Sequence, residues 1–482
     1  MKRICLSLFC ALTCSLALAG EATPPPAPPP LPPAAPFQDD PAVVAKLQAL
    51  GEKSAVILGK FRVEPAGVEK YHGALKGGPG RRDYGNKMAY APDRGTALYC
   101  GANHGSPHRL NDVWEFHLGS NTWRMICAPG RDATRLRGMQ NDEKKLNDLI
   151  AKGTDVEKNK AELEKIHAQM KAWYAGVEVR DGYLQDTYNG GPVGPWHTWD
   201  GLTYDAKARR LCWAVLDTDN FADEKNRVHR GLTRSFAKIT GQDPEKLVAE
   251  LKPSSSMYMY DPAKGRWTRQ LGEGPFPIMR AMGGTLNYIP DRDITVWYAC
   301  VGCTPGGYDE GMWAYDAKTN KWTNLVPGGT ISGLMRQKKA PGEEIQAAYS
   351  PKHGKLIVVH KEMTFAFDFA TNSWARVADN PASGIDCVSV FACDTNAGVC
   401  LLVGKKGGQW SKEPWQLAAY DPGTDKWEVV EVKGDALPQD IPDRWDGAQA
   451  FSGYYDAKYN AFVLYCARSG QTWAYRHATT KR

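Results

Sequence analysis

The sequence predicts an all-β fold, namely a six-bladed β-propeller of four-stranded antiparallel blades that carries helical insertions. Three observations predict it. Aromatic residues end apolar runs at intervals of 55, 52, 53 and 55 residues, at Tyr260, Tyr315, Phe367, Tyr420 and Tyr475. A Trp follows most of these aromatics seven residues later, and pairs of short apolar runs precede them. A repeat of about 50 residues with four short strands is typical of propeller blades.

The aromatic residue and the Trp frame a tight turn in each repeat. In the fragment YDPAKGRW, Asp261 opens the turn, Gly265 closes it and Trp267 lies in the next strand. Asp, Pro, Gly and Asn favour such turns because of their backbone preferences and side-chain hydrogen bonds. The constant spacing predicts that these Trp residues pack in the core rather than bind a ligand. They are Trp123, Trp267, Trp322, Trp374 and Trp427.

Two further strands, joined by a short polar turn, precede each aromatic residue. Apolar side chains take alternate positions in them, as expected of antiparallel strands with one buried face. Each repeat is therefore expected to hold four strands. The six paired segments are MAYAPDRGTALYC, LTYDAKARRLCWAV, LNYIPDRDITVWYA, AAYSPKHGKLIVV, VFACDTNAGVCLLV and GYYDAKYNAFVLYC.

This order of strands, turns, aromatic residue, Asp and Trp resembles kelch repeats over roughly residues 68–482. The Gly-Gly that kelch repeats carry after the second strand is kept in part, at Gly101 and Gly302, and is replaced elsewhere, for example at His360-Lys361. On this pattern the chain resembles the kelch-repeat β-propeller family, within the galactose oxidase-type propeller superfamily in the broad sense. The resemblance implies a ring of blades around a central channel.

The ends of the repeat region predict how the ring closes. The sixth repeat ends at Tyr475, and its Trp would fall at position 482, where the chain stops. We expect Val68–Leu75 to supply the missing outer strand, because this pairing would cover an open sheet edge.

The interval from Phe116 to Tyr260 is longer than one period, and we interpret it as one blade with two insertions. These are a helical hairpin at 132–174 and a second helical insertion at 218–252, while a seventh blade is the alternative.

The N-terminal region predicts export. Residues 1–19 have a basic start, a short apolar run and the cleavage motif Ala17-Leu18-Ala19, which are typical of a signal peptide. We therefore expect a secreted or periplasmic protein, and the residues before Cys10 and Cys14 disfavour a lipid anchor. Residues 20–38 are rich in proline and are expected to form an extended linker without a core. Residues 39–67 are expected to hold a helix that begins at Asp40-Pro41, followed by a lead-in to the propeller.

Composition excludes several partners. The formal net charge is +6, and the excess is not gathered into a basic run, so a nucleic-acid partner is not expected. After the first 19 residues no apolar run is long enough to span a membrane. We expect a monomer. Five cysteines in strand-like runs are interpreted as buried core residues rather than as disulfides; they are Cys100, Cys212, Cys300, Cys400 and Cys466.

The two ends of the predicted ring differ in their connections. Short turns of nearly constant length form one face, whereas the other face collects both insertions and all the uneven loops, where function concentrates. Arg and Asp there could bind a carboxylated or hydroxyl-rich ligand, and Trp could stack on sugars. The alternative is that Arg and Asp pair with each other between blades as structural ties. The candidates are Arg82, Asp83, His104, His108, Trp196, His197, Trp199, Asp200, Arg280, Arg444, Trp445 and Asp446.

These candidates favour a non-catalytic module that binds a glycan or a protein. The enzyme alternative is a carbohydrate-active enzyme at the channel mouth, similar either to copper radical oxidases such as galactose oxidase or to sialic-acid mutarotases. The sequence has no nucleophile elbow, P-loop or zinc-protease helix. No cofactor is predicted, although copper and calcium stay open. His104 and His108 are weak metal candidates because they lie in a Gly/Ser/Pro loop.

Overall fold

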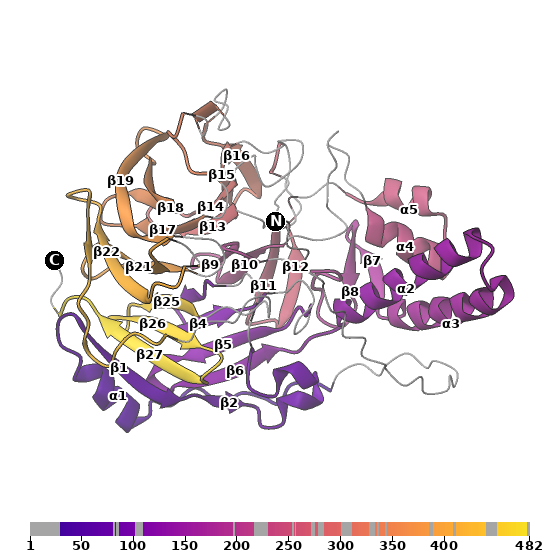
Figure 1. Cartoon of the computed structure of the whole chain (residues 1–482), viewed down its shortest axis with the longest axis horizontal. Helices are drawn as coiled ribbons and strands as arrows, with labels where there is room; N and C mark the ends of the chain where they lie inside the picture. Colours follow the sequence, from indigo (N-terminus) through magenta and orange to yellow (C-terminus); the bar gives the residue numbers. More distant parts are fainter. Residues whose placement is uncertain are drawn as a thin grey trace, which may run out of the picture.

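Small antiparallel β-sheets dominate the structure (Figure 1). We number six of them sheets 1 to 6, in the order in which their antiparallel hairpins follow one another from residue 89 onward. A separate two-stranded hairpin is formed by β7 (Val177–Arg180) and β8 (Tyr183–Asp186). The structure is a computed structural model and describes residues 29–80, 82, 86–101, 109–195, 198–215, 230–252, 255, 257–270, 275–277, 284–299, 311–326, 333–334, 337–342, 345–384, 389–407, 411–439 and 451–479.

The first three sheets follow the order of the chain. Sheet 1 consists of β3 (Ala89–Ala91), β4 (Thr96–Tyr99), β5 (Val113–His117) and β6 (Thr122–Cys127), with β2 (Arg62–Glu64) added parallel to β6. Sheet 2 consists of β9 (Leu202–Asp205), β10 (Arg210–Ala214), β11 (Met257–Asp261) and β12 (Arg266–Arg269). Sheet 3 consists of β13 (Gly284–Ile289), β14 (Ile294–Ala299), β15 (Gly311–Asp316) and β16 (Lys321–Asn324).

The last three sheets include the two ends of the domain. Sheet 4 consists of β17 (Gln346–Ser350), β18 (Lys355–Asp368) and β19 (Ser373–Gly384); the first half of β18 pairs with β17 and the second half with β19. Sheet 5 consists of β20 (Val390–Asp394), β21 (Val399–Lys405), β22 (Trp415–Asp421) and β23 (Lys426–Val429). Sheet 6 consists of β25 (Ser452–Asp456), β26 (Ala461–Cys466), β27 (Gln471–Arg476), β1 (Ser54–Lys60) and β24 (Lys433–Gly434).

We call β3, β9, β13, β17, β20 and β25 the first strands of sheets 1 to 6. They contact one another in sequence order. β3 contacts β9, β9 contacts β13, β13 contacts β17, β17 contacts β20, β20 contacts β25, and β25 contacts β3. Parallel bridges link two of these pairs, between Lys87 and Gly453 and between Asp200 and Thr285. Following the contacts from β3 therefore leads back to β3.

A strand from the N-terminal region completes sheet 6, as predicted, but this strand is Ser54–Lys60 and not the predicted Val68–Leu75. β1 pairs antiparallel with β27, and Ala55 lies opposite Tyr475, where the other repeats have their Trp. The predicted segment Val68–Leu75 instead forms two short 3₁₀ helices, η1 (Val68–Lys70) and η2 (Gly73–Leu75). Gly67 enters η1 with a φ of 72°, a left-handed conformation that an ordinary strand does not contain. β1 and β2 both lie inside the segment 39–67 that was expected to be a lead-in.

One turn design recurs throughout the described chain. Twelve connections between adjacent strands are four residues long, and each ends on a residue with positive φ, such as Gly265 at 63° or Asn320 at 56°. In seven of these turns the preceding strand ends in an Asp that accepts backbone N–H groups inside the turn. Asp261, for example, accepts from Ala263 and Lys264. This is the Asx geometry that favours Asp at that position. The turn predicted from YDPAKGRW is confirmed.

The predicted aromatic–Trp pairs form the centres of the outer strand pairs. Five Trp residues lie directly opposite the aromatic residue seven positions earlier, with ring centroids 4.9–5.3 Å apart. Trp123, Trp267 and Trp322 are buried, whereas Trp374 and Trp427 are half-buried. Cross-strand aromatic pairs stabilise a sheet. The seven-residue spacing is therefore explained by packing between adjacent strands, without a ligand.

The helices α2 to α5 gather at one side of the molecule, whereas α1 (Pro41–Gln48) lies at the opposite side (Figure 1). Residues 132–174 form α2 (Ala133–Ala151) and α3 (Val156–Tyr174), and the second insertion contains α4 (Gly231–Thr240) and α5 (Pro244–Glu250). These helices and the β7–β8 hairpin share a small core that includes Met170, Trp173 and Phe236. No helix in the described part of the chain is long and apolar enough to cross a membrane.

The N-terminal segment packs on the sheets. α1 (Pro41–Gln48) begins at the N-cap Asp40, as predicted, and 3₁₀ helix η3 (Leu118–Ser120) lies against it. Residues 29–38 belong to the segment 20–38 that was expected to form an extended linker without a core. They instead lie along sheet 1, where Arg124 donates a hydrogen bond to the backbone of Ala35. Residues 1–28, including the expected signal peptide, lie outside the described part.

Candidate functional site

The beginnings of the six first strands meet in a cluster that we call the polar centre. Its side chains are Asn86, Lys87, Asp200, Thr285 and Asn287. Asn287 lies in the middle of β13, and the other four lie at or just before the start of a first strand. All except Lys87, whose side chain is 14% exposed, are buried. Backbone groups from the starts of the other first strands complete the cluster, which therefore joins all six sheets.

Lys87 holds sheet 1 to sheets 2 and 3. Its Nζ donates to Asp200 Oδ2 at 3.3 Å, to the Leu286 carbonyl at 2.9 Å and to Asn287 Oδ1 at 2.8 Å. An ammonium has three hydrogens, so these contacts use its full donor capacity. Burial lowers the pKa of Lys87 below its ordinary value, opposed by the charge of Asp200. Lys87 therefore acts as a tie between sheets.

Asp200 is the acceptor at which four sheets meet. Its Oδ2 accepts from Lys87, from Thr285 Oγ1, and from the backbone N–H of Ala347 at 3.1 Å. Burial raises the pKa of Asp200 above its ordinary value, opposed by the charge of Lys87. The predicted alternative, in which acidic and basic residues tie neighbouring repeats together, describes this residue, although its partner is a lysine.

Two buried amide oxygens at the beginnings of first strands make no hydrogen bond in the part of the chain that the structure describes. They are Asn86 Oδ1, whose amide nitrogen donates to the Ser389 carbonyl, and Gln346 Oε1. Buried acceptors are nearly always paired with protein, water or ligand. Both side chains are almost fully buried, so neither oxygen is open to a ligand at the surface.

Arg82 lies beneath the surface and is not available to a ligand. It is fully buried, and its guanidinium donates to both carboxylate oxygens of Asp112, at 3.1 and 2.5 Å, and to the Gly101 carbonyl. Burial alone would lower the pKa of Arg82, but the charge of Asp112 and its hydrogen bonds raise it. The pair is a tie within sheet 1, which corrects the prediction that Arg82 lines the binding face.

Trp199 also differs from its prediction. It precedes β9 in a left-handed conformation, with a φ of 50°, and only 7% of it is exposed. It belongs to the hydrophobic cluster that contains Val390 and Phe451. A buried ring offers no free face to a sugar, so Trp199 is a packing residue and not a stacking platform.

The other sequence candidates lie outside the described residues. They are Asp83, His104, His108, Trp196, His197, Arg280, Arg444, Trp445 and Asp446. Within the described ranges, no three His, Cys, Asp or Glu side chains are grouped to hold a metal ion. Sequence reasoning missed Asn86, Lys87, Thr285 and Asn287. The signal that could have revealed most of them is a polar residue at the start of an otherwise apolar first strand.

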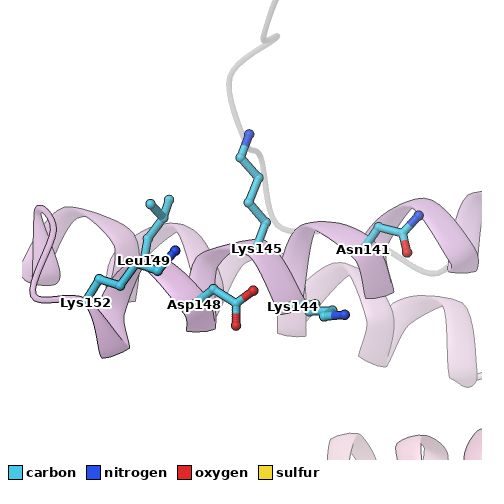
Figure 2. Close-up of a pocket in the computed structure, with 6 residues that line it drawn as sticks. All are labelled: Asn141, Lys144, Lys145, Asp148, Leu149 and Lys152. Atoms are coloured by element: carbon cyan, nitrogen blue, oxygen red, sulfur yellow. The ribbon is translucent and has the colours of Figure 1, made fainter.

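A shallow depression of about 290 Å³ lies on α2 (Figure 2). Its lining residues all belong to that one helix, and only Leu149 among them is more than slightly covered. Figure 2 shows Lys145 pointing away from the helix axis, with the other side chains spread along it. Because no second element closes over it, we assign no ligand to this depression. Its other lining residues are Asn141, Lys144, Asp148 and Lys152.

Comparison with known proteins adds little to this description. No family model and no curated protein matches the chain. Among solved structures, the chain is similar to an oligogalacturonate lyase from Vibrio parahaemolyticus, with 7% sequence identity over 84% of this chain and 92% of that chain and a TM-score of 0.38. A similarity at this level carries no argument about this chain, and the function must be argued from the residues themselves.

Proposed function

We propose that the chain is an exported, kelch-type, six-bladed β-propeller that binds a glycan at the face where its first strands begin. The proposal of six blades is supported by the six sheets, by the contacts that lead from β3 back to β3, and by the pairing of β1 with β27. A strand from one end of the chain that completes the sheet at the other end is a common way to join a ring of blades.

The contrast between the two ends of the sheets carries the functional proposal. At one end, which we call the turn face, lie eleven of the twelve four-residue connections. At the other end, the loop face, lie the connections between second and third strands and between sheets. These range from the four residues 467–470 to the 74 residues 128–201. Binding residues concentrate in variable loops on a rigid scaffold, which favours the loop face.

The polar centre lies at the loop face and suits a ligand rich in hydroxyl groups. Its charged groups, Lys87 and Asp200, are paired with each other and with neutral partners. Their charges are therefore balanced within the protein, without a charged ligand. This pairing favours a neutral glycan over an anionic ligand.

Binding to a panel of soluble polysaccharides, measured by affinity electrophoresis, tests the proposal. The variant Arg444→Ala/Trp445→Ala alters two of the binding residues predicted from the sequence. We expect it to bind the retained glycan about tenfold more weakly, the effect of losing about 1.4 kcal/mol. The matched turn-face variant Lys264→Ala/Lys318→Ala should bind like the unaltered chain.

Equal losses in both variants, or a loss confined to the turn-face variant, would place the ligand elsewhere. Retention of no glycan by the unaltered chain would contradict the glycan proposal and leave a protein ligand. Chemical conversion of a retained glycan would show that the face is catalytic.

A further inference from the structure

The proline-rich segment 29–38, which we call the strap, is held by hydrogen bonds to its carbonyl groups. Tyr188 donates through Oη to the Pro29 carbonyl at 3.4 Å, and Tyr71 donates through Oη to the Pro30 carbonyl at 3.3 Å. Arg124 donates through Nη1 to the Ala35 carbonyl at 2.8 Å. Proline has no N–H, so donors facing carbonyl groups are the contacts that a proline-rich chain can make.

An aromatic anchor fixes the C-terminal end of the strap. The ring of Phe37 stacks on His117 with centroids 4.8 Å apart, and the Arg124 guanidinium lies 3.7 Å from the centre of the same ring. Glu64 holds Arg124 through hydrogen bonds of 2.9 and 2.7 Å to its Nε and Nη2. Leu31 packs against the main core near the other end of the strap.

The strap does not fill the space beneath it. A cavity of about 430 Å³ lies between residues 32–38 and the side chains of β2 and β6, including Arg62, Thr122 and Met125. The strap is therefore attached at its two ends, by the tyrosines and by the Phe37 anchor. It could leave the surface without exposing a continuous core.

We propose that the surface formed by Tyr71, Tyr188, Arg124, His117 and Glu64, which we call the proline groove, is a binding site for an extended proline-rich peptide. Its occupant in this structure is the chain's own strap, and the same sequence supplied by another molecule can replace it. Proline-rich segments already favour the extended helix with three residues per turn, so they lose little entropy on binding, and aromatic grooves recognise them in this way. This inference does not depend on the proposed glycan function.

The first test loosens the N-terminal part of the strap without shortening the chain. In the strap variant, Pro29, Pro30, Pro32 and Pro33 are replaced by serine, and the probe is a fluorescent peptide of the natural residues 29–38, followed by fluorescence polarisation. A tethered strap competes at an effective concentration in the millimolar range, so the peptide should bind the strap variant about tenfold or more tightly than the unaltered chain. A peptide with the same four serines is the matched control and should not bind.

Groove variants locate the site. Tyr71→Phe and Tyr188→Phe in the strap variant each remove one hydroxyl donor and should weaken peptide binding by about two- to tenfold. Lys318→Ala, on the turn face, should leave binding unchanged. Absence of peptide binding to a strap variant with a native circular dichroism spectrum, or undiminished peptide binding by both tyrosine variants, would overturn the proposal.

A second measurement uses the natural strap. In the otherwise unaltered chain, Tyr71→Phe/Tyr188→Phe should raise the rate of proteolysis within residues 29–38 about tenfold or more, while the melting temperature of the domain changes little, because the two bonds hold only the strap. An unchanged cleavage rate would show that the tyrosines do not hold the strap and would overturn the proposal.

Discussion

Replacing Asp200 with alanine is expected to lower the free energy of unfolding by about 3–5 kcal/mol, the cost of breaking a buried ion pair from one side. The variant leaves the Lys87 ammonium almost buried, with only neutral acceptors. It also removes the acceptor for Thr285 and for the Ala347 N–H. Urea denaturation of the purified domain measures the loss. The deficit should shrink as pH rises, because Lys87, whose pKa is lowered by burial, can then lose its proton.

A double variant separates charge from packing. Lys87→Met/Asp200→Ala removes both charges, so it should recover a large part of the stability that Asp200→Ala alone loses. If the single and double variants are equally unstable, the loss comes from the cavity and the lost neutral hydrogen bonds. If Asp200→Ala costs less than about 1 kcal/mol, a typical value for an exposed pair, the polar centre does not join the sheets.

Truncation of Trp267 is expected to cost about 3–5 kcal/mol, the range for large aromatic side chains removed from a core. Trp267 is fully buried, lies between Tyr260 and Trp213, and donates through Nε1 to the Asn111 carbonyl. The expected effect of Trp267→Ala is therefore loss of packing, an unfilled cavity and an unpaired carbonyl.

Trp427→Ala is the matched comparison for Trp267→Ala. Trp427 has the same place in sheet 5, opposite Tyr420, but is half-buried and exposes part of its ring. Its truncation should cost about half as much or less, because less apolar surface returns to water. Thermal denaturation followed by circular dichroism measures both. Equal losses in the two variants would show that burial does not decide the role of the repeated Trp.

The repeats were predictable because each rests on local chemistry. The Asp at the end of a strand, the Gly or Asn that closes the turn and the Trp seven residues after an aromatic are fixed by backbone geometry within eight residues. Pairing within each sheet follows from these turns. The six expected two-strand segments are all present, and the five Trp residues lie opposite their aromatic partners.

Features that depend on distant contacts were less accessible. The absence of a sixth Trp correctly indicated that an N-terminal strand completes sheet 6, but local pattern could not decide between Ser54–Lys60 and Val68–Leu75. The strap lacks N–H groups and periodicity, so nothing in its sequence showed that Tyr71, Tyr188 and Arg124 bind it. Lys87 and Asp200 are 113 positions apart, and their pairing requires the arrangement of the sheets.

The proposed ring of sheets, with the polar centre at one face, requires β1 to pair with β27. Lys60 and Gln471 lie directly opposite each other in that ladder, at a separation that a disulfide can bridge. Mild oxidation of Lys60→Cys/Gln471→Cys, followed by mass spectrometry of the peptides, should therefore yield the 60–471 cross-link in nearly all molecules. Glu69→Cys/Gln471→Cys, which tests closure by residues 68–75 instead, should give none. Absence of the 60–471 cross-link, or formation of the 69–471 cross-link in its place, would contradict the closure on which this account depends.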